Sequence, residues 1–136
     1  MNQMTYKFPI RIYYEDTDAG GIVYHSNYLN FCERARTEFL RKLGIEQDTY
    51  LKHNTAFVVK SMDIDFKTAA KFNDELIVET TLLKLKKASV EFSQIIINKN
   101  EQLVFTAKVQ VACVNTLEMK PMAIPKVILE VLQSAS

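Results

Sequence analysis

The chain has 136 residues, which is enough for one compact domain with a single hydrophobic core and too short for two independent cores. Seventeen basic and sixteen acidic residues leave a formal net charge of +1, which argues against nonspecific binding to nucleic acid or to an acidic membrane. No segment approaches the roughly 18 apolar residues of a membrane span, and the first ten residues lack a signal-peptide pattern. We therefore expect one domain over residues 1–136 of a soluble, cytoplasmic protein.

The first predicted element is a strand over residues 8–14, which is rich in isoleucine and tyrosine and contains Pro9 near its start. From Asn27 the spacing of apolar residues changes to three and four, which predicts an amphipathic helix over residues 27–43. Ser26 or Asn27 is expected to cap its start, and Gly44 to end it in a left-handed conformation. Its polar side is predicted to carry Glu33, Arg34, Arg36, Glu38, Arg41 and Lys42.

The rest of the chain predicts mainly strands. A short helical or irregular piece over residues 46–53 precedes four strands at residues 57–66, 76–85, 89–98 and 103–114. The last of these is long enough to be a central, well-paired strand. A short helix over residues 126–132 follows, with Pro125 as its first residue.

This order of elements predicts the α+β class. The strands follow one another with short turns and do not alternate with helices, so the sheet is expected to be antiparallel. A helix of about 16 residues, roughly 24 Å long, suits the concave face of a strongly twisted sheet. We therefore expect an antiparallel β-sheet wrapped around one long central α-helix, and we expect these two elements to form the whole core.

The segment YYEDTDAGGIVYHSNY, residues 13–28, concentrates the chemistry of the chain. It places Asp18 beside the Gly20-Gly21 pair and His25 just before the predicted helix. A carboxylate on a glycine turn that runs into a helix start supplies a base or nucleophile next to free backbone N–H donors. This arrangement suits attack on a polarised carbonyl and points to acyl transfer.

Metal and thiol chemistry are poorly supported by the sequence. A calcium loop that began at Asp16 would need a bidentate glutamate at its twelfth position, where Asn27 stands. The two histidines, His25 and His53, have no zinc-ligand spacing. Cys32 and Cys113 fit as small buried apolar residues, since free cysteine is often buried. We expect no metal and no cofactor.

A longer pattern extends this motif through Tyr14, Asp16, Asp18, Gly20, Gly21, Val23, Tyr24, His25, Asn27 and Tyr28 to Glu33 and Arg34, and later through residues 109–114 and 119–121. With this pattern the chain resembles the YbgC-like acyl-CoA thioesterases of the 4-hydroxybenzoyl-CoA thioesterase (hotdog) family over nearly its whole length. The resemblance implies the hotdog fold and hydrolysis of the thioester bond of acyl-CoA, or of an acyl group attached to acyl-carrier protein, to the free acid and the thiol.

The resemblance also implies roles for individual residues. Asp18 matches the catalytic aspartate, which acts as nucleophile or as general base on water, and the backbone N–H of His25 would polarise the thioester carbonyl. Gly20 and Gly21 would let the loop approach the acyl group, while Asn27 and Tyr28 match residues at the helix start. The resemblance further implies dimers joined sheet edge to sheet edge, often paired into tetramers, with each active site at the seam between subunits.

Other assignments remain open at this stage. The His25 side chain would orient water or protonate the leaving thiolate, or only its backbone would act; Tyr24 is expected to form the wall of the site. Asp16 is expected to hold the loop. Lys60 and Lys86 are candidates for the phosphates of coenzyme A. The length of the acyl chain is left open, because it depends on the packing of aromatic residues across the dimer seam.

Two alternative functions compete with hydrolysis. A noncatalytic module that binds acyl-CoA or acyl-carrier protein would use the same groove, although an intact Asp18 argues against it. A hotdog dehydratase would need a histidine on or near the long helix paired with a carboxylate, and residues 27–43 contain no histidine.

Overall fold

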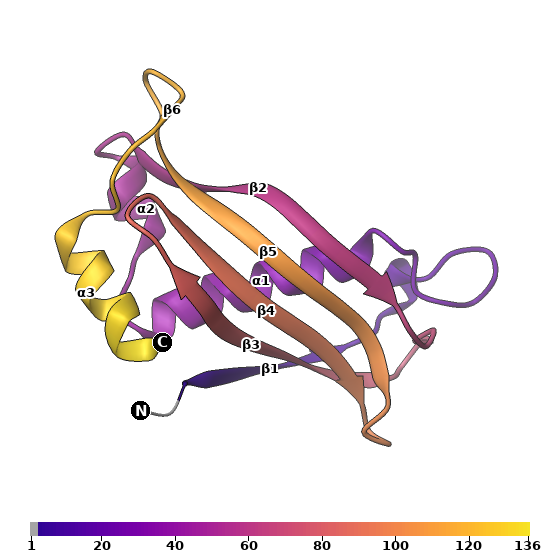
Figure 1. Cartoon of the computed structure of the whole chain (residues 1–136). Helices are drawn as coiled ribbons and strands as arrows, with labels where there is room; N and C mark the ends of the chain where they lie inside the picture. The colour runs from indigo at the N-terminus through magenta and orange to yellow at the C-terminus, as the bar shows by residue number, and fades with distance from the viewer. Residues whose placement is uncertain (1–2) are drawn as a thin grey trace.

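A computed structural model describes residues 3–136 and shows a curled antiparallel sheet around one long helix (Figure 1). Helix α1 crosses the inner face of the sheet, and helix α3 lies at the end where both termini are found. The elements in chain order are β1 (Thr5–Arg11), the short 3₁₀ turn η1 (Tyr14–Asp16), α1 (Asn27–Lys42), α2 (Gln47–Leu51), β2 (Thr55–Phe66), β3 (Glu75–Leu85), β4 (Ser89–Asn98), β5 (Leu103–Asn115), β6 (Lys120–Pro121) and α3 (Lys126–Ala135).

The five long strands follow the order β1-β3-β4-β5-β2, with every neighbouring pair antiparallel, and the short β6 adds to β5. The predicted α+β class and the antiparallel sheet are confirmed. Strand β5 pairs with β4 on one side and β2 on the other, as its length indicated. Strands β1 and β2 form the two outer edges of this order, so each has one side without a neighbouring strand among residues 3–136.

Helix α1 buries the apolar stripe that its spacing predicted, including Tyr28, Phe31, Cys32, Ala35 and Phe39. Its end is fixed by two backbone bonds, from Gly44 N–H to Arg41 O at 2.9 Å and from Ile45 N–H to Leu40 O at 2.9 Å. This bonding pattern requires a left-handed residue after the last turn, and Gly44 has a φ of +88°. The predicted glycine cap is confirmed.

The start of α1 differs from the prediction. Ser26 occupies the N-cap position, but its side chain makes no capping hydrogen bond. The Asn27 side chain instead donates from Nδ2 to the carbonyl of Asp16 at 2.9 Å. The expected side-chain cap is therefore wrong, because the amide of Asn27 is used to tie the preceding loop to the helix.

The first strand is also placed differently. It covers Thr5–Arg11 rather than residues 8–14, and the chain leaves the sheet before Tyr13 to form the turn η1. Pro9 therefore lies in the interior of a strand. It is tolerated there because β1 is an outer strand, where a missing N–H need not break a ladder bond.

The C-terminal helix contributes more to the core than expected. It runs over Lys126–Ala135, with Pro125 as its N-cap rather than its first residue. It buries Ile128, Leu132 and Ala135 within the main hydrophobic cluster. The expectation that α1 and the sheet form the whole core is therefore wrong, since α3 closes one end of it.

Strand β2 contains an irregularity that preserves its apolar face. The pairing with β5 shifts register between Val59 and Ser61, which leaves Lys60 as an extra residue. Side chains alternate between the two faces of a strand, so one extra residue exchanges the faces beyond it. As a result the five apolar residues all oppose buried residues of β5 on the helix side of the sheet: Phe57, Val59, Met62, Ile64 and Phe66.

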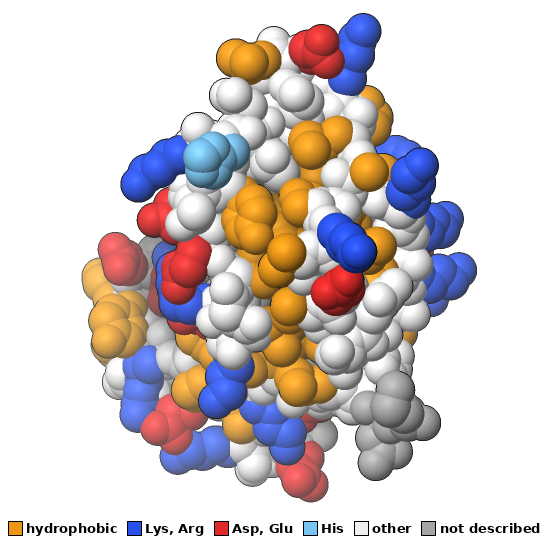
Figure 2. Space-filling view, turned by 90° about the vertical axis from the view of Figure 1, so that its left-hand side faces the viewer, with side chains coloured by type: hydrophobic (Ala, Val, Ile, Leu, Met, Phe, Trp, Pro, Cys, Tyr) orange, Lys and Arg blue, Asp and Glu red, His pale blue; other side chains and the backbone are white. Residues whose placement is uncertain are grey.

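The end of the molecule that carries α3 exposes hydrophobic side chains among lysines and arginines (Figure 2). Leu51 on α2, Leu117 and Met119 in the loop before β6 and Val127 on α3 are exposed at this end. None of the helices within residues 3–136 combines the length and the apolar composition that crossing a membrane requires.

The glycine cap provides a test of the fold. We expect Gly44→Ala to lower the free energy of unfolding by about 1 kcal/mol, because an alanine at φ +88° is strained. Urea unfolding followed by circular dichroism measures the change. Lys42→Ala, at an exposed position in the same turn, is the control and should change stability by less than about 0.5 kcal/mol. Equal stability of Gly44→Ala and wild type would contradict the assigned cap.

Candidate active site

The loop that carries Asp18 is a short hairpin between two bridged residues, Thr17 and Val23. Asp18 N–H donates to Ile22 O at 2.9 Å, and Gly21 N–H donates to Asp18 O at 3.0 Å. Gly21 has a φ of +80°, the left-handed conformation that closes three-residue hairpin loops. The second glycine is thus required by the turn itself.

Backbone pairing with residues 70 and 71 holds the Asp18 loop against the rest of the molecule. Val23 N–H donates to Ala70 O at 2.9 Å, and Ile22 forms a bridge with Lys71. Asp16 holds the other side of the loop, because its carboxylate accepts from Tyr13 N–H at 2.8 Å and its carbonyl accepts from Tyr24 N–H at 2.9 Å. The expected structural role of Asp16 is confirmed by these bonds.

The Asp18 side chain is exposed and oriented by its own loop. Its Oδ1 accepts from the N–H of Gly20 at 2.8 Å, which leaves Oδ2 free of any bond within residues 3–136. A Cβ on Gly20 would lie 3.2 Å from Oδ1 of Asp18. Any larger residue there would press on this carboxylate. Glycine is therefore favoured at position 20 because it leaves room for the carboxylate, and not because the backbone needs a positive φ.

His25 lies at the turn between the loop and α1 and is exposed. Its backbone N–H finds no acceptor among residues 3–136, so it remains available to an external oxygen. The imidazole ring lies 4.5 Å from the ring of Tyr24 and 6.2 Å, edge to face, from the ring of Phe66. His25 and Tyr24 therefore line the same side of the loop, next to the end of β2.

An aromatic cluster supports this end of the helix. The ring of Tyr28 stacks on Phe105 at 5.2 Å, and Phe66 lies 5.3 Å from Phe105. The hydroxyl of Tyr28 accepts from the buried N–H of Ala70 at 3.1 Å. Burial raises the pKa of Tyr28, so its hydroxyl stays protonated and serves as a structural link. Phe66, 52% exposed, is the part of the cluster open to a ligand.

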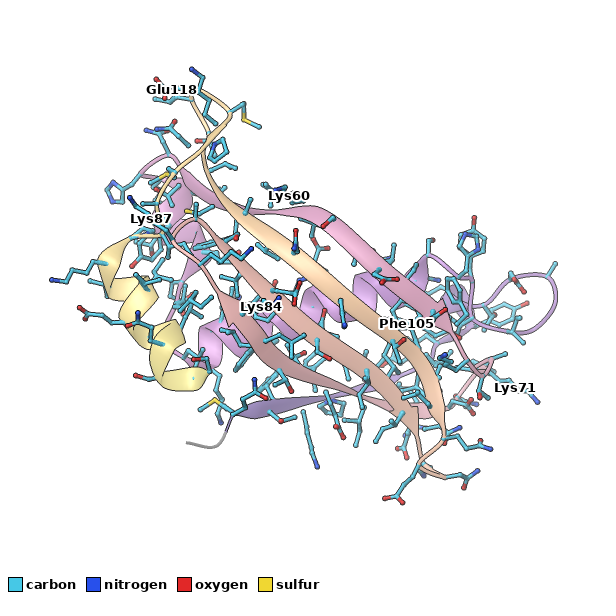
Figure 3. The ribbon with its side chains drawn as sticks, in the orientation of Figure 1. Lys60, Lys71, Lys84, Lys87, Phe105 and Glu118 are labelled. Atoms are coloured by element: carbon cyan, nitrogen blue, oxygen red, sulfur yellow. The ribbon has the colours of Figure 1, made fainter. Side chains whose placement is uncertain are left out.

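The two predicted lysines do not join Asp18 within one chain. Lys60 lies midway along the outer strand β2, and the turn with Lys86 lies between the labelled Lys84 and Lys87 toward α3 (Figure 3). Lys71 and Phe105 lie toward the opposite end, and Lys71 adjoins the Asp18 loop through its bridge to Ile22. Within the described chain, Lys71 is thus closer to this loop than either predicted lysine.

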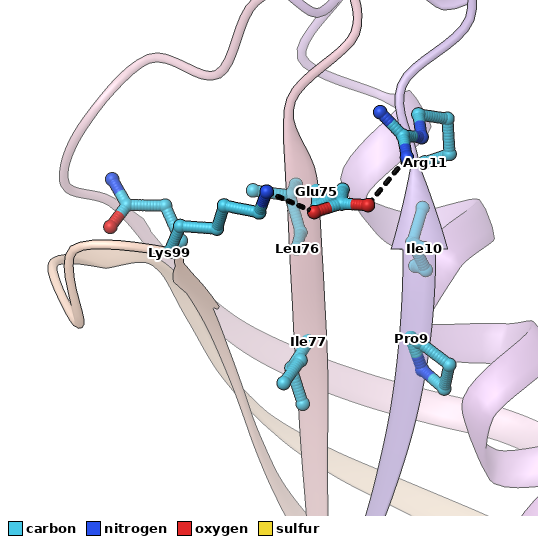
Figure 4. Close-up of a pocket in the computed structure, with 8 residues that line it drawn as sticks. Pro9, Ile10, Arg11, Glu75, Leu76, Ile77 and Lys99 are labelled. Carbon is cyan, nitrogen blue, oxygen red and sulfur yellow. Dashed lines mark hydrogen bonds and ion pairs between the residues drawn. The ribbon is translucent and has the colours of Figure 1, made fainter.

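A pocket of about 450 Å³ lies on the other side of the sheet, between β1, β3 and the end of β4 (Figure 4). Glu75 pairs with both Arg11 and Lys99 at its rim. The bond from Lys99 and the charge of Arg11 lower the pKa of Glu75, so the charges at this rim compensate one another. Neither Asp18 nor His25 lines this pocket.

One polar group was placed on the wrong side of α1 by the sequence pattern. Arg36 is buried rather than on the polar face, and it donates to Oε1 of buried Gln94 at 2.9 Å. The helical spacing could not reveal this, because its partner Gln94 stands on β4, 58 residues further along the chain. The alternation of β4, which puts Gln94 between buried Phe92 and Ile96, is the signal that was missed.

Cys32 and Cys113 are both buried and free. Burial raises the pKa of the Cys32 thiol to about 12 and also raises the pKa of Cys113, so both remain thiols and fill core space. Within residues 3–136, no group of three or more His, Cys, Asp or Glu residues is arranged to hold a metal ion.

The fold and this loop define the class of the protein. A probable thioesterase from Bartonella henselae superposes with a TM-score of 0.83 at 37% identity, covering 90% of this chain and all of that one. The acyl-CoA thioesterase YbgC of Haemophilus influenzae is 51% identical over 122 residues, 89% of each chain. The acyl-CoA thioester hydrolase YbgC of Escherichia coli O6:H1 is 43% identical over 126 residues, 93% of this chain and 94% of that one.

The sequence profile of the Thioesterase-like superfamily matches residues 13–132. The chain therefore belongs to the thioesterase-like superfamily, within which it is similar to the YbgC acyl-CoA thioesterases. The predicted family is confirmed. The match begins at Tyr13, at the start of the loop that presents Asp18 and His25.

The Tyr28 link can be tested by stability. We expect Tyr28→Phe to lower the free energy of unfolding by about 1–3 kcal/mol, because the buried N–H of Ala70 loses its acceptor. Tyr24→Phe, which removes the hydroxyl of an exposed tyrosine four residues earlier, is the control and should be near neutral. Both changes are measured by urea unfolding, and equal effects would contradict the link.

Proposed function

We propose that this chain hydrolyses acyl-CoA thioesters and that Asp18 and the backbone N–H of His25 carry the reaction. The observation that supports this most directly is the exposed Asp18 carboxylate, held on the same loop as a free N–H at a helix start, in a relative of acyl-CoA thioesterases. The carbonyl oxygen of the thioester would accept from His25 N–H. A hydrogen-bond donor in this position stabilises the negative charge that develops on this oxygen.

Asp18 can act in two ways with this geometry. As a general base it takes a proton from water while the oxygen of that water attacks the carbonyl carbon; as a nucleophile it attacks directly and water later cleaves the anhydride. In both cases the C–S bond breaks, the thiol of coenzyme A leaves with a proton, and the carboxylic acid forms. In this proposal the imidazole of His25 would orient the water or protonate the thiolate.

The remaining predicted residues have supporting roles in this proposal. Gly20 leaves room beside the Asp18 carboxylate, and Gly21 closes the turn. Tyr24 forms a wall beside the imidazole, and Asn27 fixes the loop to the helix through the carbonyl of Asp16. Lys60 and Lys86 would contact the phosphates of coenzyme A only from a second subunit, because they lie away from Asp18 in their own chain.

We also propose that the active unit is a dimer joined through the outer strands β2. The outer edge of β2 has unpaired backbone groups, and Val58 on this strand is an exposed apolar residue, a combination that favours pairing with another strand. Such pairing would bring the Lys60 strand of one subunit to the site of the other. A tetramer of two such dimers, a cytoplasmic location and acyl-carrier protein as an alternative thioester donor belong to the same proposal.

The central residue is tested by release of thiol from aliphatic and aromatic acyl-CoAs. We expect Asp18→Asn to lower kcat/KM by about 10²–10⁴-fold, because an amide neither accepts the proton nor attacks. Glu15→Gln removes an exposed carboxylate three residues earlier and should keep the activity. If wild type binds acyl-CoA without releasing thiol, the protein is a binding module and the proposal fails.

The dimer is tested by light scattering coupled to size-exclusion chromatography. We expect wild type to be a dimer or tetramer, and Val58→Asp to dissociate the β2 contact and lower thiol release, since it adds a charge to this edge. Val127→Asp is the matched control, because Val127 is 67% exposed on α3 whereas Val58 is 38% exposed on β2. Dissociation by the control, or a monomeric and fully active wild type, would contradict the proposed interface.

A further inference from the structure

Arg36 is a buried cation whose position is fixed by neutral groups. It is only 8% exposed and donates from Nη1 to Oε1 of Gln94 at 2.9 Å. Gln94 is itself fixed, because its Nε2 donates to Cys32 O and to Thr80 Oγ1, both at 2.9 Å. This network holds one edge of the guanidinium group between α1 and β4.

Arg36 forms no ion pair with the described part of its own chain. Among residues 3–136, the ion pairs within 4.0 Å involve Arg11, Arg41, Lys67 and Lys99 but not Arg36. No side-chain nitrogen in this part of the chain is both fully buried and without a hydrogen bond, so the other guanidinium nitrogens reach accessible space. Burial lowers the pKa of Arg36 and outweighs the opposing charge of Glu33, as expected for a cation removed from water without a hydrogen-bonded counterion.

Arg36 lines a pocket of about 100 Å³ between α1 and β2. This volume holds roughly three water molecules, or a small polar group. The pocket also contains the polar side chains of Thr37 and Gln47 and the apolar side chains of Phe57 and Val59. Glu33 also lines this pocket; its side chain is exposed, and although its charge acts on Arg36, the two make no ion pair within 4.0 Å.

A line of apolar side chains connects this pocket with the Asp18 loop. Phe66, at one end of β2, contacts the ring of His25, and Val59, near the middle of the strand, lines the Arg36 pocket. Met62 and Ile64 lie between them on the same face of β2, because the bulge at Lys60 preserves this face. An extended hydrocarbon chain lying along this line would have its carbonyl at His25 and its far end at Arg36.

We propose that Arg36 binds a carboxylate at the far end of the acyl group, so that the preferred substrates are medium-chain acyl-CoAs with a terminal carboxylate. The inference rests on the proposed thioesterase function and adds the class of acyl group. The rise of about 1.5 Å per residue puts Arg36 about 14 Å from the start of α1, a distance that a medium-length chain spans. A terminal carboxylate would supply the counterion that Arg36 lacks and would accept its free N–H groups in pairs.

A terminal methyl group fits this pocket poorly. It would leave the guanidinium both desolvated and unpaired, which is unfavourable for a buried cation. The binding of a carboxylate instead exchanges bound water for a charge-assisted hydrogen bond. The selectivity for the acyl group therefore depends on Arg36, whereas the chemistry of hydrolysis depends on Asp18.

The test compares acyl-CoAs of equal chain length that differ only at the far end. Thiol release is measured for octanoyl-, decanoyl- and dodecanoyl-CoA and for the mono-CoA thioesters of the corresponding dicarboxylic acids. For wild type, we expect kcat/KM to be about tenfold or more higher for one or more of the dicarboxylate substrates than for its plain partner, the effect of one charge-assisted hydrogen bond. For Arg36→Met, the ratio should fall to one or below, mainly through KM.

Arg34→Met is the matched control, because it removes an exposed arginine from the same helix two residues earlier. It should leave the ratio unchanged. A ratio between two substrates does not depend on the fraction of folded enzyme, so loss of the Gln94 bond cannot by itself produce the expected result. An unchanged ratio of the two kcat/KM values in Arg36→Met would overturn the inference. If Arg36→Met also dissociates into monomers while this ratio is unchanged, Arg36 pairs with the second subunit and not with the substrate.

Binding of non-hydrolysable thioether analogues separates this inference from the proposed function. If wild type releases no thiol from any substrate, the proposed hydrolase function is wrong. Calorimetry still tests Arg36, because the dicarboxylate analogue should bind wild type about tenfold more tightly than its plain partner. Equal affinities for the two analogues would overturn the role of Arg36 whether or not the protein is a hydrolase.

Discussion

The structure of the candidate site depends on the attachment of the Asp18 loop and the start of α1 to the backbone of Ala70. The carbonyl of Ala70 accepts from Val23 N–H, and its N–H donates to the hydroxyl of Tyr28. One residue between β2 and β3 therefore bonds to the hairpin loop on one side and to the helix on the other. This shared contact fixes where Asp18 lies relative to the N–H of His25, on which any reaction at a carbonyl depends.

Most of the fold could be predicted from local patterns. The stripe of apolar residues from Tyr28 to Phe39 and the position of Gly44 predicted α1 almost to the residue, because both signals are local to the helix. The long strands β4 and β5 were predicted equally well. Two of the errors are at Pro9 and Ser26, where a contact with a distant segment replaced the local preference: an outer strand accepted a proline, and Asn27 bonded back to Asp16.

The site was predicted in part. The resemblance on residues 13–28 led to the hairpin with Asp18 and to the free N–H of His25, since both belong to one continuous segment. Arg36, Phe66 and Lys71 come from other elements, and their relation to that segment depends on the curl of the sheet. The assignment of Arg36 to the polar face failed because helical periodicity says nothing about a polar partner such as Gln94 on the opposite strand. Buried pairs of this kind can be recognised from sequence only when both members are considered together.

Strand β2 links the proposed chemistry to the proposed dimer. Its bulge at Lys60 keeps five apolar side chains on the helix side, while its outer edge has no neighbouring strand among the described residues 3–136. The apolar side chains on its faces need to be covered, and the backbone groups along its open edge need hydrogen-bond partners. The helix side is only partly covered between Phe66 and Val59, both of which are exposed although they oppose buried residues of β5. An acyl chain or a second subunit would bury this remaining apolar surface. The proposed edge-to-edge dimer would cover part of it and leave room for an acyl chain beside the subunit contact. In the proposed dimer the same strand would both join the subunits and line the binding groove beside the Asp18 loop.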